Sequence, residues 1–423
     1  MPPASGAALA SPLAVGDVLR EGGPTPHFQP FVDLEGGHVV GYEALIRGPR
    51  GSTLERPDAL FRAAHHEDRV TELDCHCRIA AFRAAETAGL GAGSTLFVNL
   101  EPAAVGRRAP AGLHEAALAG PPGARVVIEI TERSLTSDPA GLLRAVTELR
   151  EQGFGIAIDD VGADDRSLAL MPFLRPDVIK LDLQLVRDRP SVKMATILNA
   201  VGAQVERTGA QVVAEGIEDE DQIDVAHSLG ATLAQGYLFG RPAPLPACPP
   251  APEQPLHMLG RSAHPASRTP FEVLQSGRRL RRGTKGLLRS ISRAMEIEAE
   301  ALGASAVALA TFQYARHYTP PVQHTYGTLG RRMAFVGVLG AGLPAFPTPG
   351  VRGGHIADGD PLLQEWDVAV IGPHFAASLA ARDLGDTGPE DERRFDFVVS
   401  HNRDLATEAA RSLMSRIAPA ERD

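Results

Sequence analysis

The sequence predicts an α/β protein in which a TIM-like (β/α)₈ barrel is followed by a separate mixed α/β domain. Between residues 27 and 242, eight short apolar runs alternate with longer helical stretches, which is typical of βα units around a parallel sheet. A segment dense in proline follows, and globular sequence then resumes as far as residue 419. A chain of 423 residues also exceeds one ordinary core, so two domains are expected.

The eight strand candidates are short runs rich in β-branched and aromatic residues. They lie at residues 27–33, 38–46, 95–100, 125–130, 154–160, 177–182, 211–216 and 231–239. Helical stretches fill the intervals between them. In one of these, residues 138–153, Asp138 is suited to cap the N-terminus and Gly153 to end the helix. This spacing fits a barrel.

The domain boundaries follow the changes in composition. We predict a flexible tail over residues 1–24, a barrel over 25–243, a proline-rich linker over 244–269 and a second domain over 270–419. Proline removes backbone donors, so the linker is expected to lack regular structure. The second domain begins with a basic helical stretch at 276–303, contains apolar runs at 304–312 and 333–340, and closes with a helix at 404–417.

The charge and hydropathy of the chain narrow the possible partners. The net charge of −10 argues against a general electrostatic grip on DNA or on an anionic membrane. No apolar run reaches the roughly 18 residues that a membrane-spanning helix needs. The first 17 residues lack the basic start and compact apolar core of a signal peptide, so we expect a cytoplasmic protein.

Cysteine and histidine residues give weak signals. The cysteines Cys75, Cys77 and Cys248 are too few for a disulfide framework. The motif "DCHC" at 74–77 lacks the second ligand pair of a metal clip, so we interpret it as helix packing. The second domain contains scattered histidines, His317, His324 and His374, and we assign no site to them.

Polar side chains recur near the ends of the predicted barrel strands. They are Glu43, Asn99, Glu129, Asp159, Asp160, Lys180 and Glu215. In a parallel barrel the C-terminal ends of all strands share one face, so these residues are expected to converge. A single acid at a strand end is more often a helix cap or a surface ion pair, but the repetition over six strands favours a common site.

Clustered acids repel one another unless a cation neutralises them. Oxygen ligands without Cys or His point to Mg²⁺ or Mn²⁺, and two ions are expected because such a pair stabilises both oxygens of a phosphodiester displacement. Lys180 is expected to orient and activate the attacking water. Arg47 shares a strand face with Glu43 and can reach a substrate phosphate, and Gln29 can present an amide to the ligand.

Two further acids allow more than one interpretation. Glu132 follows Glu129 by three residues and is either a capping-box partner or a brace for the next loop. Glu218 is either a supporting group behind the ligands or an acid in the first turn of a helix.

The motifs on these strands resemble those of EAL-domain cyclic di-GMP phosphodiesterases. "YEALIRG" resembles the family signature, and the other motifs follow in the family's order over residues 27–242: "FQPFVD", "FVNLEP", "IEITE", "IDDVG", "DVIKLD", "VAEGIE" and "AQGYLFGRP". The resemblance implies an EAL-type barrel that opens cyclic di-GMP to linear pGpG with Mg²⁺ or Mn²⁺.

The resemblance also implies a role for each residue. The metal ligands fall on Glu43, Asn99, Glu129, Asp159 and Glu215, with Asp160 beside the second ion. Lys180 matches the water-activating lysine, Gln235 and Glu218 match supporting polar positions, and Glu132 matches the glutamate that steadies the loop after the aspartate pair.

One loop departs from the family pattern. The family usually continues its aspartate pair as "DDFGTGYSSL", whereas this chain reads "DDVGADDRSL", so residues 161–166 lose a glycine and gain two acids. In the family this loop couples dimerisation to metal binding. The expectation of a homodimer therefore rests on the family resemblance alone. With this altered loop, the sequence does not distinguish slow turnover from no turnover.

The second domain resembles a DICT sensory domain in three segments: "TFQYARHYTPPVQHTYGTL", "EWDVAVIGPHFAASLAARDL" and "RRFDFVVSHNRDLATEAARSL". Its ligand or protein partner is not readable from the sequence. The leading hypothesis is a metal-dependent cyclic di-GMP phosphodiesterase regulated by this sensory domain. The alternative is a weak or inactive receptor that binds cyclic di-GMP without turnover.

Overall fold

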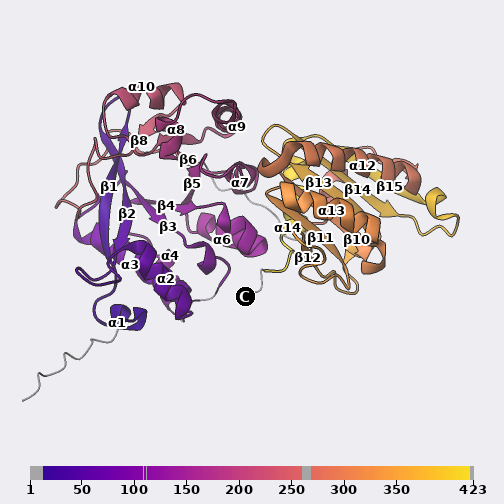
Figure 1. The fold of residues 1–423 in the computed structure, drawn as a ribbon, viewed down its shortest axis with the longest axis horizontal. Coiled ribbons are helices and arrows are strands. Elements are labelled where there is room, and N and C mark those ends of the chain that lie inside the picture. The colour runs from indigo at the N-terminus through magenta and orange to yellow at the C-terminus, as the bar shows by residue number, and fades with distance from the viewer. Residues whose placement is uncertain (1–12, 108, 111, 260–267, 420–423) are drawn as a thin grey trace, which may run out of the picture.

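Two β-sheets organise the chain into two lobes that lie side by side (Figure 1). The structure is a computed structural model that describes residues 13–107, 109, 110, 112–259 and 268–419. The first lobe contains a closed barrel of eight strands, and the second contains an open sheet of seven strands. This confirms the predicted α/β class, with a barrel followed by a separate mixed domain.

The barrel strands follow one another in chain order around the barrel. They are β1 Thr25–Asp33, β2 Val39–Arg47, β3 Thr95–Asn99, β4 Arg125–Ile130, β5 Gly155–Val161, β6 Val178–Leu181, β7 Gln211–Ala214 and β8 Leu233–Ala234. Neighbours from β2 to β8 are parallel, but β1 is antiparallel to both β2 and β8. The expectation of a wholly parallel barrel is therefore wrong for β1. The turn at 34–38 is too short for the crossover that a parallel pair needs.

Helices surround the barrel. They are α1 Val15–Arg20, α2 Pro57–His66, α3 Val70–Thr87, η1 Pro102–Ala104, α4 Leu113–Leu118, α5 Arg133–Ser137, α6 Pro139–Glu151, α7 Ser167–Leu174, α8 Leu183–Arg187, α9 Val192–Thr208 and α10 Asp221–Ser228. Helix α6 shows why the local sequence folds in this way. Asp138 accepts a hydrogen bond from Gly141 N at 2.8 Å, and Gly153, just beyond the helix, adopts a positive φ. Both predicted helix signals are confirmed.

The start of the barrel domain is more ordered than the sequence indicated. Residues 15–20 form α1, although a flexible tail was expected over 1–24. Val15 and Val18, one helical turn apart, are buried in a cluster with α2 and α3, and Glu67 accepts a hydrogen bond from Val15 N at 2.8 Å. Asp17 accepts a local hydrogen bond from Ala14 N at 3.2 Å, but the contact with Glu67 comes from a distant residue, which the local sequence does not reveal. Residues 1–12 lie outside the described part of the chain.

The proline-rich linker lies against the barrel. Its described part up to residue 259 contains no helix or strand, as expected. Leu256 packs with Phe31, Phe97 and Val127 inside the barrel, and Asp177 accepts a hydrogen bond from Leu259 N at 2.6 Å. The linker is therefore attached to the first domain over this stretch. Residues 260–267 lie outside the described residues.

The second sheet has the strand order β12-β11-β10-β13-β14-β15-β9. Its elements are α11 Pro270–Gln275, β9 Arg281–Thr284, α12 Lys285–Leu302, η2 Gly303–Ser305, β10 Val307–Tyr314, η3 Ala315–His317, α13 Pro320–Arg332, β11 Phe335–Ala341, β12 Arg352–Gly354, η4 Pro361–Gln364, β13 Glu365–Ile371, β14 Ala376–Asp383, η5 Glu390–Glu392, β15 Arg394–Ser400 and α14 Arg403–Met414. Alternate residues along β10 and β13 pack into different core clusters, so helices cover both faces.

The helical expectation for residues 276–303 is only partly right. Helix α12 begins at Lys285, and the preceding residues 281–284 form β9, which pairs with β15. Arg282 in β9 forms an ion pair with Asp396 across the strands at 2.8 Å. The strand conformation of these basic residues is therefore stabilised by pairing with β15, which a helical pattern in the sequence cannot predict.

The second domain docks on the barrel through α14, which lies beside α6 and α7 (Figure 1). Arg411 on α14 donates a hydrogen bond to the carbonyl of Phe173 in α7, and Arg352 donates to the carbonyl of Thr136 at 2.6 Å. Within the described ranges, no helix combines the length and apolar character needed to cross a membrane.

Candidate functional site

A buried lysine occupies the centre of the barrel's C-terminal end. Lys180 lies on β6, and its side chain is 1% exposed. Its ammonium nitrogen lies 2.8 Å from Glu129 Oε1, 2.9 Å from Asp159 Oδ1, 2.8 Å from Glu215 Oε1 and 3.5 Å from Glu43 Oε2. The four acids come from β4, β5, the end of β7 and β2, so strands far apart in sequence converge as predicted.

Two amides hold Glu43 in this cluster. Asn99 Nδ2 donates to Glu43 Oε1 at 3.2 Å, and Gln235 Nε2 donates to Glu43 Oε2 at 2.8 Å. Burial by itself raises the pKa of Glu43, but the charge of Lys180 and these hydrogen bonds outweigh it and lower the pKa. Glu43 is therefore kept as a carboxylate with a fixed orientation.

Glu129, Glu215 and Asp160 are held closer to their protonated forms. Burial, together with the charge of Glu43, raises the pKa of Glu129 well above its usual range. Burial raises the pKa of Glu215 to about 8 despite Lys180, with the charge of Asp159 adding to the effect. Burial and the charge of Asp159 raise the pKa of Asp160 to about 6. The cluster contains more acid groups than the single positive charge of Lys180 can neutralise.

Burial alone lowers the pKa of Lys180, but Asp159, Glu129 and the other acids outweigh it and raise the pKa well above the usual range. Lys180 is thus a fixed positive charge. It can donate hydrogen bonds but does not readily accept a proton.

The donor set fits divalent cations. Ligand atoms of Asp159, Asp160 and Glu215 lie within 4.8 Å of one another. Both oxygens of Glu129 are buried, and apart from its ion pair with Lys180 neither accepts a hydrogen bond from any described group. All these donors are oxygens, which Mg²⁺ and Mn²⁺ prefer. Asp160 has a φ of +54°, a strained conformation for a non-glycine residue at the end of β5.

Gln29 lies on β1 and Arg47 lies at the end of β2, the strand that also carries Glu43. Gln29 pairs with Glu43 in the β1–β2 register, and its Nε2 donates to Gly240 O at 3.1 Å. Arg47 is half-buried and donates to the carbonyl of its neighbour Ile46 at 2.8 Å. Among the described residues Arg47 has no acidic partner within ion-pair distance, so its charge is available to an anion.

Glu218 and Glu132 lie outside the lysine cluster. Glu218 is exposed and forms an ion pair with Arg187 at 2.8 Å, and its backbone N donates to Gln222. Glu132 immediately precedes α5; its nearest cation is Arg133 at 3.9 Å, and its negative charge contributes to the raised pKa of Asp160. Neither carboxylate hydrogen-bonds to the described residues of the loop at 161–166.

The two extra acids of that loop make no contact with Lys180. Asp165 pairs with Lys193 of α9 at 3.3 Å, and Asp164 accepts a hydrogen bond from Arg166 N at 2.9 Å. Neither belongs to the group of acids around Lys180. Asp164 nevertheless lines the cavity beside this cluster together with Asp160, whereas Asp165 is held by Lys193.

Two features of the site were missed by sequence reasoning. Phe31 is fully buried, and its ring centre lies 5.8 Å from the Lys180 ammonium. The alternation in "HFQPFVD" could have indicated that Phe31 faces the barrel interior with Gln29. Gly236 lies so close to the backbone of Ile217 that a Cβ would meet Ile217 O at 1.9 Å, which explains a glycine directly after Gln235.

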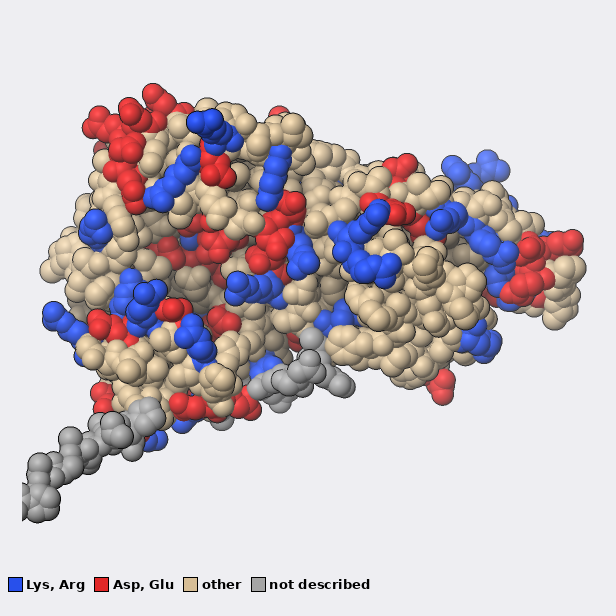
Figure 2. All heavy atoms as spheres, viewed as in Figure 1, with Lys and Arg blue, Asp and Glu red and all other residues tan. Residues whose placement is uncertain are grey.

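A cavity of about 540 Å³ lies beside the cluster and is lined by Asn99, Glu132, Asp160 and Asp164, among others. Figure 2 shows acidic side chains gathered in a hollow on this face of the barrel lobe, with basic side chains around its rim. An anionic substrate can thus meet cationic side chains at the rim while the acids inside bind cations.

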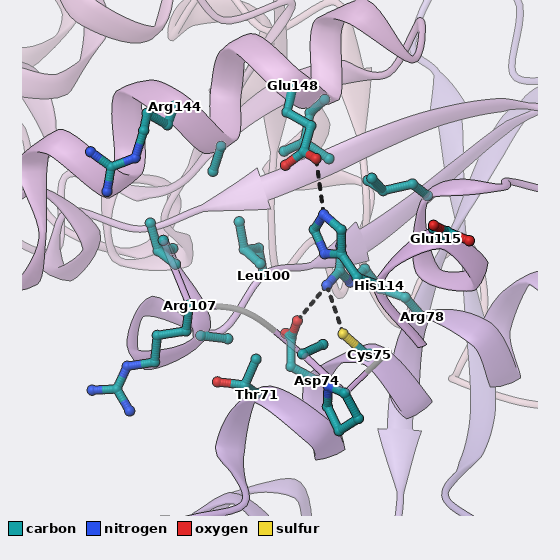
Figure 3. A pocket seen from close by; sticks show the side chains of 18 of the residues that line it. Thr71, Asp74, Cys75, Arg78, Leu100, Arg107, His114, Glu115, Arg144 and Glu148 are labelled. Atoms are coloured by element: carbon teal, nitrogen blue, oxygen red, sulfur yellow. Dashed lines mark hydrogen bonds and ion pairs between the residues drawn. The ribbon is translucent and has the colours of Figure 1, made fainter. Parts of the chain in front are cut away.

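The "DCHC" segment lies on α3, and its residues Asp74 and Cys77 line the same cavity. Cys75 and Cys77 are buried, as the helix-packing interpretation expects, whereas Cys248 is exposed. Figure 3 shows Arg78 directed at both Asp74 and Cys75, and the ion pair to Asp74 spans 2.8 Å. The motif is therefore part of a buried ion pair that braces α3.

The fold and the cluster define a barrel protein with an acid-lined, lysine-centred site suited to divalent cations. Residues 14–242, more than half of the chain, match the EAL domain model, and residues 272–384 match the sensory domain found in diguanylate cyclases and two-component systems, called DICT. The chain belongs to the EAL-domain family and carries a C-terminal DICT domain.

Two curated relatives from Pseudomonas aeruginosa are cyclic di-GMP phosphodiesterases. RocR is 33% identical over 242 residues, which cover 55% of this chain and 61% of RocR. NbdA is 31% identical over 238 residues, which cover 54% of this chain and 30% of NbdA. The chain therefore spans less than two thirds of either relative.

Similar solved structures include a manganese and cyclic di-GMP complex of BlrP1 from Klebsiella pneumoniae. It is 34% identical, with a TM-score of 0.47, and the match covers 53% of this chain and 57% of that chain. A cyclic di-GMP complex of the phosphodiesterase PaMucR is 28% identical, with a TM-score of 0.46, and the match covers 54% of this chain and 96% of that chain.

Proposed function

We propose that this protein hydrolyses cyclic di-GMP to linear pGpG with two divalent cations, Mg²⁺ or Mn²⁺, and that its C-terminal domain regulates the reaction. The observation that carries the proposal is the arrangement of Glu43, Glu129, Asp159 and Glu215 around Lys180. The family membership and the activity of RocR support it.

The proposed cations are held by Glu43, Asn99, Glu129, Asp159 and Glu215, with Asp160 beside the second. When bound, the cations supply charge for the attacking and leaving oxygens and lower the pKa of a bound water. Asn99 and Gln235 fix the carboxylate of Glu43 through hydrogen bonds, so this ligand needs little rearrangement.

Hydrolysis adds one water across a phosphodiester bond. The water oxygen forms a bond to phosphorus, one P–O bond to a ribose oxygen breaks, and that oxygen gains a proton. Lys180 orients the water as a hydrogen-bond donor, because its raised pKa keeps it charged. The proton lost by the water therefore goes to a carboxylate rather than to Lys180. Arg47 binds a phosphate oxygen at the mouth of the site.

The docking of the second domain supports regulation. Arg411 of α14 donates to Phe173 O, and α7 follows directly on the loop after Asp159 and Asp160. A shift of α14 therefore acts on the helix that follows two of the proposed cation-binding acids. We propose that a signal received by the second domain reaches the site by this contact.

A receptor without turnover is the second candidate function, and the loop at 161–166 favours it. Asp165 is tied to Lys193 at 3.3 Å, in place of the aromatic residue that EAL enzymes usually carry there. Changing Ala163, Asp164, Asp165 and Arg166 to the family residues Thr, Gly, Tyr and Ser distinguishes the cases. A receptor limited by this loop gains turnover, and sedimentation velocity shows whether dimerisation changes as well.

The direct test incubates the purified protein with cyclic di-GMP and Mn²⁺ or Mg²⁺ and separates the products by chromatography. Wild-type protein is expected to form pGpG, and metal chelation or Glu43→Gln is expected to stop it. Glu206→Gln, an exposed acid on α9, is the matched control and should remain active. Binding of cyclic di-GMP without product supports the receptor, and absence of both binding and product contradicts both functions.

A further inference from the structure

A second cavity, of about 580 Å³, lies in the C-terminal domain between α12 and the strands β10 and β13. Aromatic side chains of Phe312, Tyr326, Trp366 and Phe395 line it. Phe312 and Tyr326 pack edge to face with ring centres 5.3 Å apart, and Trp366 and Phe395 do so at 6.2 Å. The volume falls within the range of roughly 300–1,000 Å³ typical of small-molecule sites.

One wall of this cavity presents a polar group without a partner. Ser292 of α12 is 5% exposed, and its hydroxyl has no hydrogen-bond partner among the described residues. A buried hydroxyl in this state costs free energy, on the order of 1–3 kcal/mol. A bound molecule with an acceptor or donor at this point removes that cost.

The rim of the cavity is positively charged. Lys285, Arg289, Arg293 and Arg316 line it, against two lining acids, Glu296 and Glu390. Lys285 pairs with Glu390, Arg293 pairs with Glu296, and Arg289 pairs with Asp391 at the edge.

Arg316 is the exception. It stacks on the ring of Tyr314 at 4.1 Å and has no acidic partner within ion-pair distance among the described residues. The neighbouring His317 is occupied by a contact of its Nδ1 with Phe312 O at 3.0 Å. The cavity therefore keeps one guanidinium, held flat by an aromatic ring, available for an anion.

We propose that this cavity binds a small molecule with an aromatic body and one anionic group. The rings of Phe312 and Trp366 contact the aromatic body, Ser292 completes a hydrogen bond, and Arg316 pairs with the anion at the rim. The site is separate from the carboxylate cluster of the barrel. Ligand binding in this cavity can therefore be tested independently of phosphodiester hydrolysis.

The chain contains a single tryptophan, Trp366, so its fluorescence reports on this cavity directly. The probe is 8-anilino-1-naphthalenesulfonate, which is aromatic and anionic, and its uncharged analogue N-phenyl-1-naphthylamine serves for comparison. We expect saturable energy transfer from Trp366 to the sulfonate at one site per chain. The uncharged analogue is expected to bind at least about tenfold more weakly.

Variants of the full-length chain locate the probe. Arg316→Gln is expected to weaken the sulfonate about tenfold and leave the uncharged analogue unchanged. Arg331→Gln, an exposed arginine of α13, is the matched control and should change neither affinity. Ser292→Leu fills the cavity and is expected to abolish binding of both probes.

A second filling variant, Val322→Phe, covers the case in which Ser292→Leu does not fold, because Val322 is only half-buried at the cavity wall. Circular dichroism checks the fold of each variant. Unsaturable binding, or binding that survives in a folded filling variant, overturns the site. Equal affinity for both probes together with no effect of Arg316→Gln overturns the anionic part of the proposal.

Discussion

Lys180 and Glu129 form an ion pair 2.8 Å long in which both side chains are almost completely buried. They come from β6 and β4, and Asp159 of the intervening strand β5 lies 2.9 Å from the same ammonium. A buried charged lysine is stable only if nearby acids compensate for its lost hydration, and buried carboxylates likewise need a nearby cation. The protonation states of Lys180 and the surrounding acids therefore depend on one another.

Replacing Lys180 by Met tests this arrangement. The change keeps the length of the side chain but leaves four acids without their cation. We expect turnover to fall at least about 100-fold, because the water loses its donor. We also expect the metal-free protein to lose about 3–5 kcal/mol of unfolding free energy, which Mn²⁺ partly restores. Urea denaturation with and without Mn²⁺ measures this.

The matched control is Lys193→Met, which removes the exposed ion pair with Asp165 and should cost less than about 1 kcal/mol. A Lys180→Met protein that is as stable and as active as wild type would show that the cluster does not depend on this charge.

Metal binding is expected to release protons. Since the pKa of Glu215 is about 8 and that of Asp160 about 6, the metal-free protein holds roughly one proton on Glu215 at about pH 7. A cation must displace it, so Mn²⁺ affinity should fall as the pH is lowered from 8 through 6. Calorimetry in buffers of different ionisation enthalpy measures the released protons, and Glu215→Gln should release fewer. Binding with no proton release at neutral pH contradicts the raised pKa.

Much of the fold and the site could be predicted because the relevant signals are local. Six of the eight barrel strands, β2 to β7, carry a polar residue near the end, and the topology brings Glu43, Glu129, Asp159 and Lys180 together. Asp138 likewise marks the start of its helix within four residues of sequence. The roles of the individual residues stay predictions.

The rest depends on contacts between distant segments. The direction of β1, the capping of α1 by Glu67 and the packing of Leu256 into the barrel are all set by residues far away in sequence. Strand β9 is similar, because its basic residues are stabilised only when β15 provides Asp396. Local propensity contains none of this information.

The second domain is expected to lose stability as the pH rises. Burial and the charge of Glu365 raise the pKa of Asp367 well above its usual range. A folded-state pKa above the unfolded value of about 3.9 gives stability that is fully present below that value. This contribution is lost as the pH rises through the folded-state pKa. Asp367→Asn should therefore flatten the dependence of unfolding free energy on pH.

Urea denaturation followed by Trp366 fluorescence measures this in the second domain, because Trp366 is the only tryptophan and adjoins Asp367. Each unit of pKa difference corresponds to about 1.4 kcal/mol. The exposed Asp358→Asn serves as control and should keep the wild-type slope. Parallel curves for wild type and Asp367→Asn would show that Asp367 titrates normally.

The contact between Arg411 and Phe173 is expected to hold α7 in place. Burial, with the charge of Arg150, lowers the pKa of Arg411 to about 10, but the group remains charged at neutral pH. Its hydrogen bond to the Phe173 carbonyl is charge-assisted and contributes on the order of 1.5–3 kcal/mol. Arg411→Met should therefore speed amide exchange in α7, measured by hydrogen–deuterium exchange, whereas exposed Arg331→Met should not.

If the second domain regulates the site through this contact, Arg411→Met also changes the rate of pGpG formation, because α7 follows the loop that begins at Asp159 and Asp160. Faster exchange with an unchanged rate would confirm the mechanical contact and remove it as the route of regulation.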